Sequence, residues 1–122
     1  MRNFAVSIAI GFMAIVMSIG PAQADHYVGA CSVELNSVHA AIAGATFYGA
    51  TGETNRSLML AKLEAANAKI ALLKYSDAID KLDDISAKAT ELVNAAKPKL
   101  SSESGTVINT AVSSAIGCVG GL

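Results

Sequence analysis

Residues 58–96, LMLAKLEAANAKIALLKYSDAIDKLDDISAKATELVNAA, decide the fold of this chain. Apolar residues recur at steps of three and four in two consecutive segments, 58–74 and 76–97, which is the spacing of one face of an α-helix. The apolar positions are Met59, Leu63, Ala66, Ile70 and Leu73, followed by Ala78, Leu82, Ile85, Ala89, Leu92 and Ala96. Two adjacent helices with one apolar face each cannot remain alone in water. We therefore expect further helices elsewhere in the chain to cover them.

The flanking sequence supplies two more candidate helices. Residues 29–48 carry one apolar stripe and residues 102–119 carry another. The β-branched residues and glycines of the last segment would also suit a strand, but the helical spacing of its apolar residues favours a helix. Because short turns make consecutive helices antiparallel neighbours, we predict an all-α, up-down-up-down four-helix bundle.

The first 24 residues have the features of a signal peptide. Arg2 precedes an apolar run at 4–19, a Gly20-Pro21 break follows, and residues 22–24 read AQA, a small-residue cleavage signal. The alternative is an uncleaved membrane anchor, since about 16 apolar residues nearly span a bilayer. We expect cleavage after Ala24. The bundle, residues 25–122, would then be one domain exported to the periplasm or the extracellular medium.

The charge of the exported part excludes one class of partner. Removing Arg2 leaves 9 − 1 = 8 basic residues against 10 acidic ones, so the net charge is 8 − 10 = −2. There is no basic stripe and aromatic residues are few, which argues against nucleic acid. No second apolar run is long enough to cross a bilayer, so we expect no stable membrane span after cleavage.

Cys31 and Cys118 are the only cysteines, and both lie in the exported part. An even pair in an oxidising compartment predicts a disulfide, with two unpaired buried thiols as the alternative. The predicted topology agrees independently. It places the start of the first helix and the end of the fourth at the same end of the bundle.

No catalytic or metal-ligating pattern stands out. His26 and His39 are the only histidines, and we interpret them as surface or boundary residues. Asp25 and His26 could chelate copper through a new terminal amine, but a flexible tail is the simpler interpretation. A group of aspartates is interleaved with lysines and spreads around its helix, which favours a solvated face over a calcium site; its members are Asp77, Asp80, Asp83 and Asp84. We expect no enzymatic activity, no metal and no cofactor.

Residues 74–116, KYSDAIDKLDDISAKATELVNAAKPKLSSESGTVINTAVSSAI, resemble the FIMAH-type helical module that is appended to extracellular proteins. The features that carry the resemblance are a helix break followed by an apolar pattern, then residues 97–100, then a serine-capped last helix; the apolar pattern is Tyr75, Ala78, Ile79, Leu82 and Ile85. The resemblance implies a non-catalytic accessory or binding domain and transfers no functional residues. This chain departs from the module by standing alone and by having a first helix that carries a cysteine.

The function predicted from these features is that of an exported interaction or structural module, which binds an unknown protein partner or self-associates. The alternative is a periplasmic four-helix bundle that holds a small ligand or a metal, although alanine-rich seams favour close packing over a cavity. For the contact surface we predict a row of small residues on the first helix together with two aromatic residues; these are Ala41, Ala45, Gly49, Phe47 and Tyr48. Aromatic residues often anchor interfaces, but the two could instead plug the end of the bundle.

Overall fold

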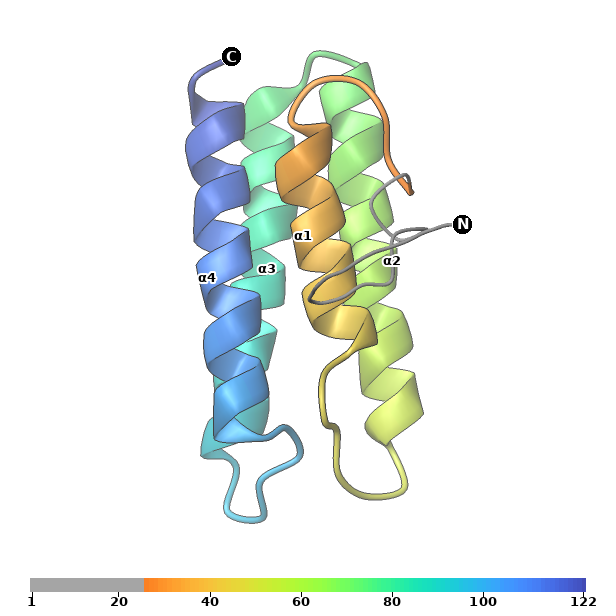
Figure 1. Ribbon diagram of the computed structural model, residues 1–122, viewed down its shortest axis with the longest axis vertical. Helices are drawn as coiled ribbons and strands as arrows, with labels where there is room; N and C mark the ends of the chain where they lie inside the picture. Colours follow the sequence, from red (N-terminus) through yellow and green to blue (C-terminus); the bar gives the residue numbers. More distant parts are fainter. Residues whose placement is uncertain (1–25) are drawn as a thin grey trace, which may run out of the picture.

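The computed structural model describes residues 26–122 and contains four α-helices. They are α1 (Ser32–Ala43), α2 (Gly52–Ala71), α3 (Tyr75–Asn94) and α4 (Ser102–Gly120). The helices alternate in direction, α2 and α4 each pack against both α1 and α3, and the C-terminus lies at the same end as the start of α1 (Figure 1). The predicted all-α four-helix bundle is confirmed. The predicted signal peptide and its cleavage site lie outside the described residues.

One continuous core runs through the bundle, and the predicted seams form it. The apolar positions at Met59, Leu63, Ala66 and Ile70 of α2 are buried, as are the five seam residues of α3 from Ala78 to Leu92. Leu73 and Ala96 were expected on the seams but are exposed, because α2 ends at Ala71 and α3 ends at Asn94. Both residues lie beyond a helix end, where the helical spacing no longer sets the direction of the side chain.

The first helix is shorter than the segment 29–48 predicted for it. It begins at Ser32 and ends at Ala43, where Gly44 donates its backbone N–H to the carbonyl of Ala40 at 2.9 Å. The chain then continues as a loop, in which Phe47 forms an isolated bridge with Leu100. The apolar spacing of Ala45 and Phe47 resembles a continued helix, but both side chains meet the bundle from a loop.

The last helix resolves the ambiguity between helix and strand in favour of the helix. Ser101 caps it, because its hydroxyl accepts a hydrogen bond from the backbone N–H of Ser104 at 3.1 Å. Gly105 is buried in the first turn and faces Val93 of α3. The absence of a side chain at Gly105 therefore lets α4 approach α3 closely.

Two loops are joined at the end of the bundle opposite the C-terminus (Figure 1). The backbone N–H of Tyr48 donates to the carbonyl of Lys99 at 2.9 Å, and that of Ser101 donates to the carbonyl of Thr46 at 3.0 Å. These bonds tie the α1–α2 loop to the α3–α4 loop. In the described part of the chain, no helix combines the length and the apolar character needed to cross a membrane.

Candidate functional site

The predicted disulfide between Cys31 and Cys118 is present, with an S–S distance of 2.04 Å. It joins the residue before α1 to the last turn of α4, so it closes one end of the bundle as the topology requires. The carboxylate of Glu34 lies within 4.8 Å of both sulfurs, and this is the one group of three potential metal ligands gathered within residues 26–122. Oxidised sulfurs are not thiolates, so the group does not make a thiolate metal site.

The structure separates the residues predicted to form a contact surface. Ala41 lies on α1 and is half-buried, while Ala45 is buried in the loop that follows. Gly49 has a φ of +84°, so the predicted small-residue row on one helix is wrong. Phe47 packs against the core, and Tyr48 remains 45% exposed. Tyr48 and Gly49 are the members of the set that lie on the surface.

Arg56 of α2 organises this end of the bundle, and it is the one arginine among residues 26–122. No sequence pattern pointed to this role. Its Nη1 donates hydrogen bonds to three carbonyl oxygens at and beyond the end of α1, those of Ile42 at 2.8 Å, Ala43 at 2.8 Å and Ala45 at 3.1 Å. The guanidinium also lies 4.8 Å from the centre of the Phe47 ring. Arg56 therefore donates to carbonyls around the C-terminus of α1, where the last turn of a helix lacks intrahelical donors. We assign it a structural role.

A cluster of rings lies where the N-terminal strap, residues 26–31, passes from α1 toward α2 (Figure 1). The imidazole of His26 stacks on that of His39, with ring centroids 4.0 Å apart and planes inclined by 25°. The ring of Tyr27 stands edge-on to His26 at 4.5 Å. The two histidines were interpreted separately in the sequence, and only the path of the strap brings them together.

The strap is fixed to α1 by a reciprocal pair of hydrogen bonds. The backbone N–H of Tyr27 donates to Oδ1 of Asn36 at 2.8 Å, and Nδ2 of Asn36 donates to the carbonyl of Tyr27 at 3.1 Å. Both residues are buried. The side-chain amide of Asn36 thus pairs with both backbone polar groups of Tyr27, as the backbone of a neighbouring strand would, and this holds Tyr27 in the core.

Two buried polar atoms of this cluster have no hydrogen-bond partner, and they are the only such side-chain atoms in residues 26–122: Tyr27 Oη and His39 Nδ1. Burial raises the pKa of the Tyr27 hydroxyl, and the carboxylate of Glu64 on α2 adds to the rise. Burial lowers the pKa of His39, the neighbouring His26 lowers it further, and Glu64 opposes the change. Glu64 is therefore the acidic neighbour of both groups, and the cluster favours a neutral His39.

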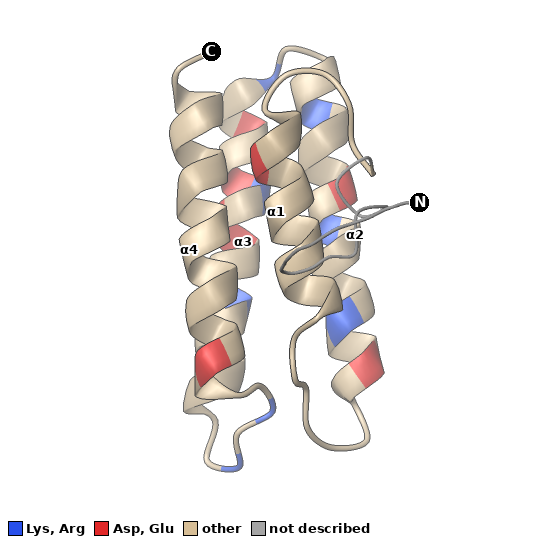
Figure 2. Ribbon diagram, viewed as in Figure 1, with Lys and Arg blue, Asp and Glu red and all other residues tan. Residues whose placement is uncertain are grey.

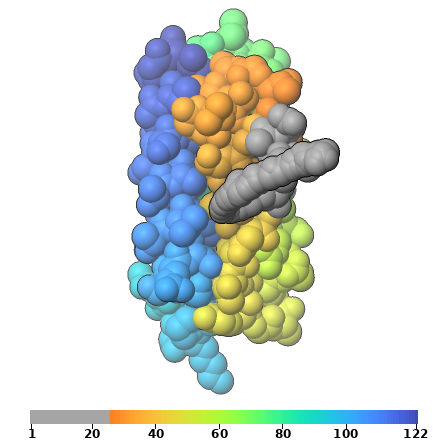
Figure 3. Space-filling model, viewed as in Figure 1, coloured from red at the N-terminus to blue at the C-terminus, as the bar shows by residue number. Residues whose placement is uncertain are grey.

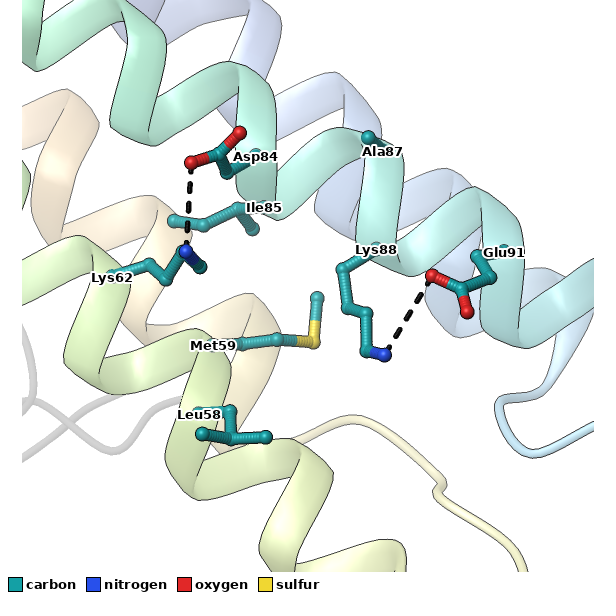
Figure 4. A pocket seen from close by; sticks show the side chains of 8 residues that line it. All are labelled: Leu58, Met59, Lys62, Asp84, Ile85, Ala87, Lys88 and Glu91. Carbon is teal, nitrogen blue, oxygen red and sulfur yellow. Dashed lines mark hydrogen bonds and ion pairs between the residues drawn. The ribbon is translucent and has the colours of Figure 1, made fainter.

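A shallow groove of about 350 Å³ lies between α2 and α3 (Figure 4). Leu58 provides exposed apolar surface there, the buried Met59 and Ile85 lie at its base, and two ion pairs border it. Lys62 reaches across to Asp84 at 3.5 Å, and Lys88 pairs along α3 with Glu91 at 3.6 Å; these groups are drawn in Figure 4. Because both lysines are already paired, an anionic ligand would have to displace a carboxylate of the protein.

The opposite pair of helices presents a surface with few charges, which we call the α1–α4 face. It is formed by Val33, Glu34, Ser37, Thr106, Val107, Thr110, Ala111 and Ser114. Glu103 is the one Asp, Glu, Lys or Arg among the 19 residues of α4, and Glu34 is the one such residue of α1. Lysine, arginine, aspartate and glutamate gather instead on α2 and α3 and in the loop before α4 (Figure 2). Figure 3 shows α1 and α4 side by side on this face.

Comparison with known proteins found no matching family model, no matching curated protein and no matching solved structure. The resemblance of residues 74–116 to the FIMAH-type module therefore stays a prediction.

Proposed function

We propose that this protein is a small exported, non-catalytic bundle that works by contact and that it associates with a second copy through the α1–α4 face. The observation that carries the proposal is the low charge of that face, on which Glu34 is the one charged side chain. Its outward positions are mostly serine, threonine, valine and alanine. Every other face between neighbouring helices carries more charge, because it includes α2 or α3.

The composition of the face matches the centre of an interface. Interface centres are depleted in charged side chains, whereas the exposed surface of a small soluble domain normally mixes charges of both signs. Val33 is 72% exposed and Val107 is 55% exposed on this face. Covering these two side chains removes apolar area from water, which is the main driving force of association.

A second copy is the partner that suits this surface best. A charged partner would lose the hydration of its charges against the face and gain little in return, because the face has almost no opposite charge to offer. A second α1–α4 face has no such cost. In a two-fold pair the same patch serves on both sides, as in most homodimers.

The size of the face predicts weak association. The 19 residues of α4 are about 28 Å long and the 12 residues of α1 about 18 Å, and each helix is about 10 Å wide, so the face covers about 450 Å². A stable complex buries about 800 Å² on each partner. We therefore expect a transient dimer that forms at high protein concentration.

The packing of the interior favours a function that uses an outer surface over one that holds a ligand in an internal cavity. The largest fully buried side chains come from all four helices and the loop before α4; they are Leu35, Ile42, Met59, Leu63, Leu82, Ile85, Leu100, Ile108, Val38, Val112 and Val119. Residues that fill a seam are not available to line a binding cavity. The outer faces are then the surfaces that remain for binding.

Sedimentation velocity over a concentration series tests the proposal. We expect the average mass of the wild type to rise with concentration and that of Val107→Lys to stay monomeric, because the lysine would have to be desolvated in the interface. Leu58→Lys is the matched control, since Leu58 is 52% exposed in the groove on the other side of the bundle.

A wild type that stays monomeric at every concentration would show the proposal to be wrong. Equal loss of association in Leu58→Lys would also contradict it. Loss of association in Tyr48→Ala with Val107→Lys unaffected would move the contact to the loop end of the bundle, where Tyr48 is exposed.

A further inference from the structure

We infer that the stacked imidazoles of His26 and His39 form a pH-sensitive latch. The latch holds the N-terminal strap on the bundle near neutral pH and lets it detach in mild acid, while the helices stay folded. The inference does not depend on the proposed self-association, because the strap covers the side of the bundle formed by α1 and α2 (Figure 1).

The first support is the geometry of the two rings. The only histidines of the chain are 13 positions apart in sequence, yet their ring centroids lie 4.0 Å apart with planes inclined by 25°. Neutral imidazoles can stack in this way, as other aromatic rings do. Two protonated rings held this close would repel each other, because a nearby like charge disfavours the charged form. The contact between the strap and α1 is therefore favourable only while at least one of the rings is neutral.

The second support is the buried side of His39. Its Nδ1 is buried and has no hydrogen-bond partner, so a proton on this atom would lack an acceptor in the closed structure. Burial lowers the pKa of His39, and the neighbouring His26 lowers it further. Detachment of the strap reduces the first cause and removes the second. The detached state therefore binds more protons than the closed state, and a falling pH favours it.

The other titratable groups around the latch do not reverse this effect. Burial outweighs the carboxylate of Glu64 on α2, which acts on His39 in the opposite sense, since the net pKa is lowered. On the strap, Tyr27 stays protonated, because burial and then Glu64 raise its pKa. On α1, Glu34 lies beside the disulfide. Glu103, the one acidic or basic residue of α4, lies in the first turn of that helix, at the opposite end of the bundle (Figure 1).

The strap stays tethered when it detaches. Its last residue, Cys31, is bound to Cys118 by the disulfide. The two hydrogen bonds between Tyr27 and Asn36 and the ring of Tyr27, which is 5% exposed, also hold the closed strap. Detachment would lift Tyr27 out of the core beside α1, which has 12 residues against the 20 of α2. It would thus uncover the seam between these two helices without breaking the disulfide.

Hydrogen exchange followed by NMR at about pH 7 and about pH 5 tests the latch, with rates corrected for the exchange of an unfolded peptide at each pH. The amide of Tyr27 reports detachment, because it donates to Oδ1 of Asn36 at 2.8 Å. We expect its protection to fall at least about tenfold between the two pH values, since each unit of pKa difference between the closed and detached states is a factor of about ten. The amide of Leu82, in the middle of α3, should stay better protected than that of Tyr27 at both pH values.

The double variant His26→Gln, His39→Gln is the matched test, because glutamine is polar but does not titrate. Its Tyr27 amide should be equally protected at both pH values, whereas Glu64→Gln should keep the fall. Equal protection of the wild-type Tyr27 amide at both pH values would overturn the proposal. A fall that persists in the double variant, or that disappears in Glu64→Gln, would overturn it too. If the amides of Tyr27 and Leu82 exchange at the same rate at the lower pH, the strap leaves only with the whole fold, and the latch is refuted.

Discussion

At the scale of single residues, Arg56 shows how one side chain can supply hydrogen-bond donors to the carbonyls at the end of a helix. Its guanidinium reaches three carbonyls around the α1 terminus, and Glu53 holds it from the preceding turn of α2 at 3.2 Å. A planar fork with five donors can serve several acceptors at once, which a lysine ammonium does less well. The side chain of Arg56 is only 20% exposed, so these bonds are partly shielded from water.

Replacing Arg56 with methionine should therefore destabilise the bundle by about 2 kcal/mol, because hydrogen bonds to a charged group contribute about 1.5–3 kcal/mol. Urea unfolding measures the change. Lys62→Met is the control, since Lys62 forms an exposed ion pair with Asp84, and such pairs contribute about 0–1 kcal/mol. Equal losses in the two variants would show that Arg56 is an ordinary surface residue.

The His39 imidazole should make stability depend on pH. Its pKa is lowered from 6.5 in the folded protein, chiefly by burial and then by His26, with Glu64 acting in the opposite sense. The unfolded chain therefore takes up a proton first as the pH falls. The contribution of a neutral His39 is complete above about pH 6.5 and is lost as the pH falls through the lower folded value.

Urea unfolding at several values between about pH 7.5 and about pH 5.5 checks this expectation. The wild type should lose stability over the interval, and His39→Gln should lose less. Curves of equal slope would contradict the assignment, because every other ionisable group is the same in both proteins.

At the scale of elements, the approach of α4 to α3 depends on Gly105. A Cβ built at Gly105 would lie 2.5 Å from Cγ2 of Val93, whereas one at Gly117 of the same helix meets nothing within 4 Å. Valine is stiff about χ1, so Val93 cannot turn away freely. The two glycines share a helix but differ in what lies beside them.

We expect Gly117→Ala to stabilise the protein and Gly105→Ala to destabilise it. The first should gain up to about 1 kcal/mol of helix propensity. The second receives the same gain but suffers overpacking, which costs about 1–3 kcal/mol. Thermal unfolding at low protein concentration, where the chain is monomeric, measures the difference. Stabilisation in both variants would mean that α3 and α4 separate easily at this contact.

At the scale of the whole molecule, the disulfide constrains nearly the entire described chain. Cys31 and Cys118 are 87 positions apart, so the bond joins the first helix to the last and encloses the other two. Few aromatic residues contribute to the core of this small domain. The constraint on the unfolded chain is therefore a large share of the stability expected for its size.

Loss of the disulfide should lower the free energy of unfolding by about 4.5 kcal/mol on a chain-entropy argument for a loop of this length. Thermal unfolding with and without reductant measures the effect, and a double Cys31→Ser, Cys118→Ser variant should match the reduced wild type. Equal midpoints in oxidised and reduced protein would show that the unfolded chain is already compact.

What the sequence by itself determined is the set of helices, their order and their buried faces. Apolar spacing is a local property, so the seam from Ala78 to Leu92 and that from Met59 to Ile70 were readable without a structure. The two cysteines allowed a single pairing. The alternating direction of the four helices placed both cysteines at the same end of the bundle. Fold class and disulfide followed from these features alone.

Tertiary structure decided the helix ends and every candidate site, because these depend on contacts between residues distant in sequence. The predicted row through Ala41, Ala45 and Gly49 is broken where α1 stops and the loop bonds to the α3–α4 connection. His26 meets His39 only because the strap is pinned by Asn36. The α1–α4 face exists only because α1 and α4 are neighbours in the bundle. Neither the periodicity of one helix nor the number of its charges predicts which helix will pack beside it.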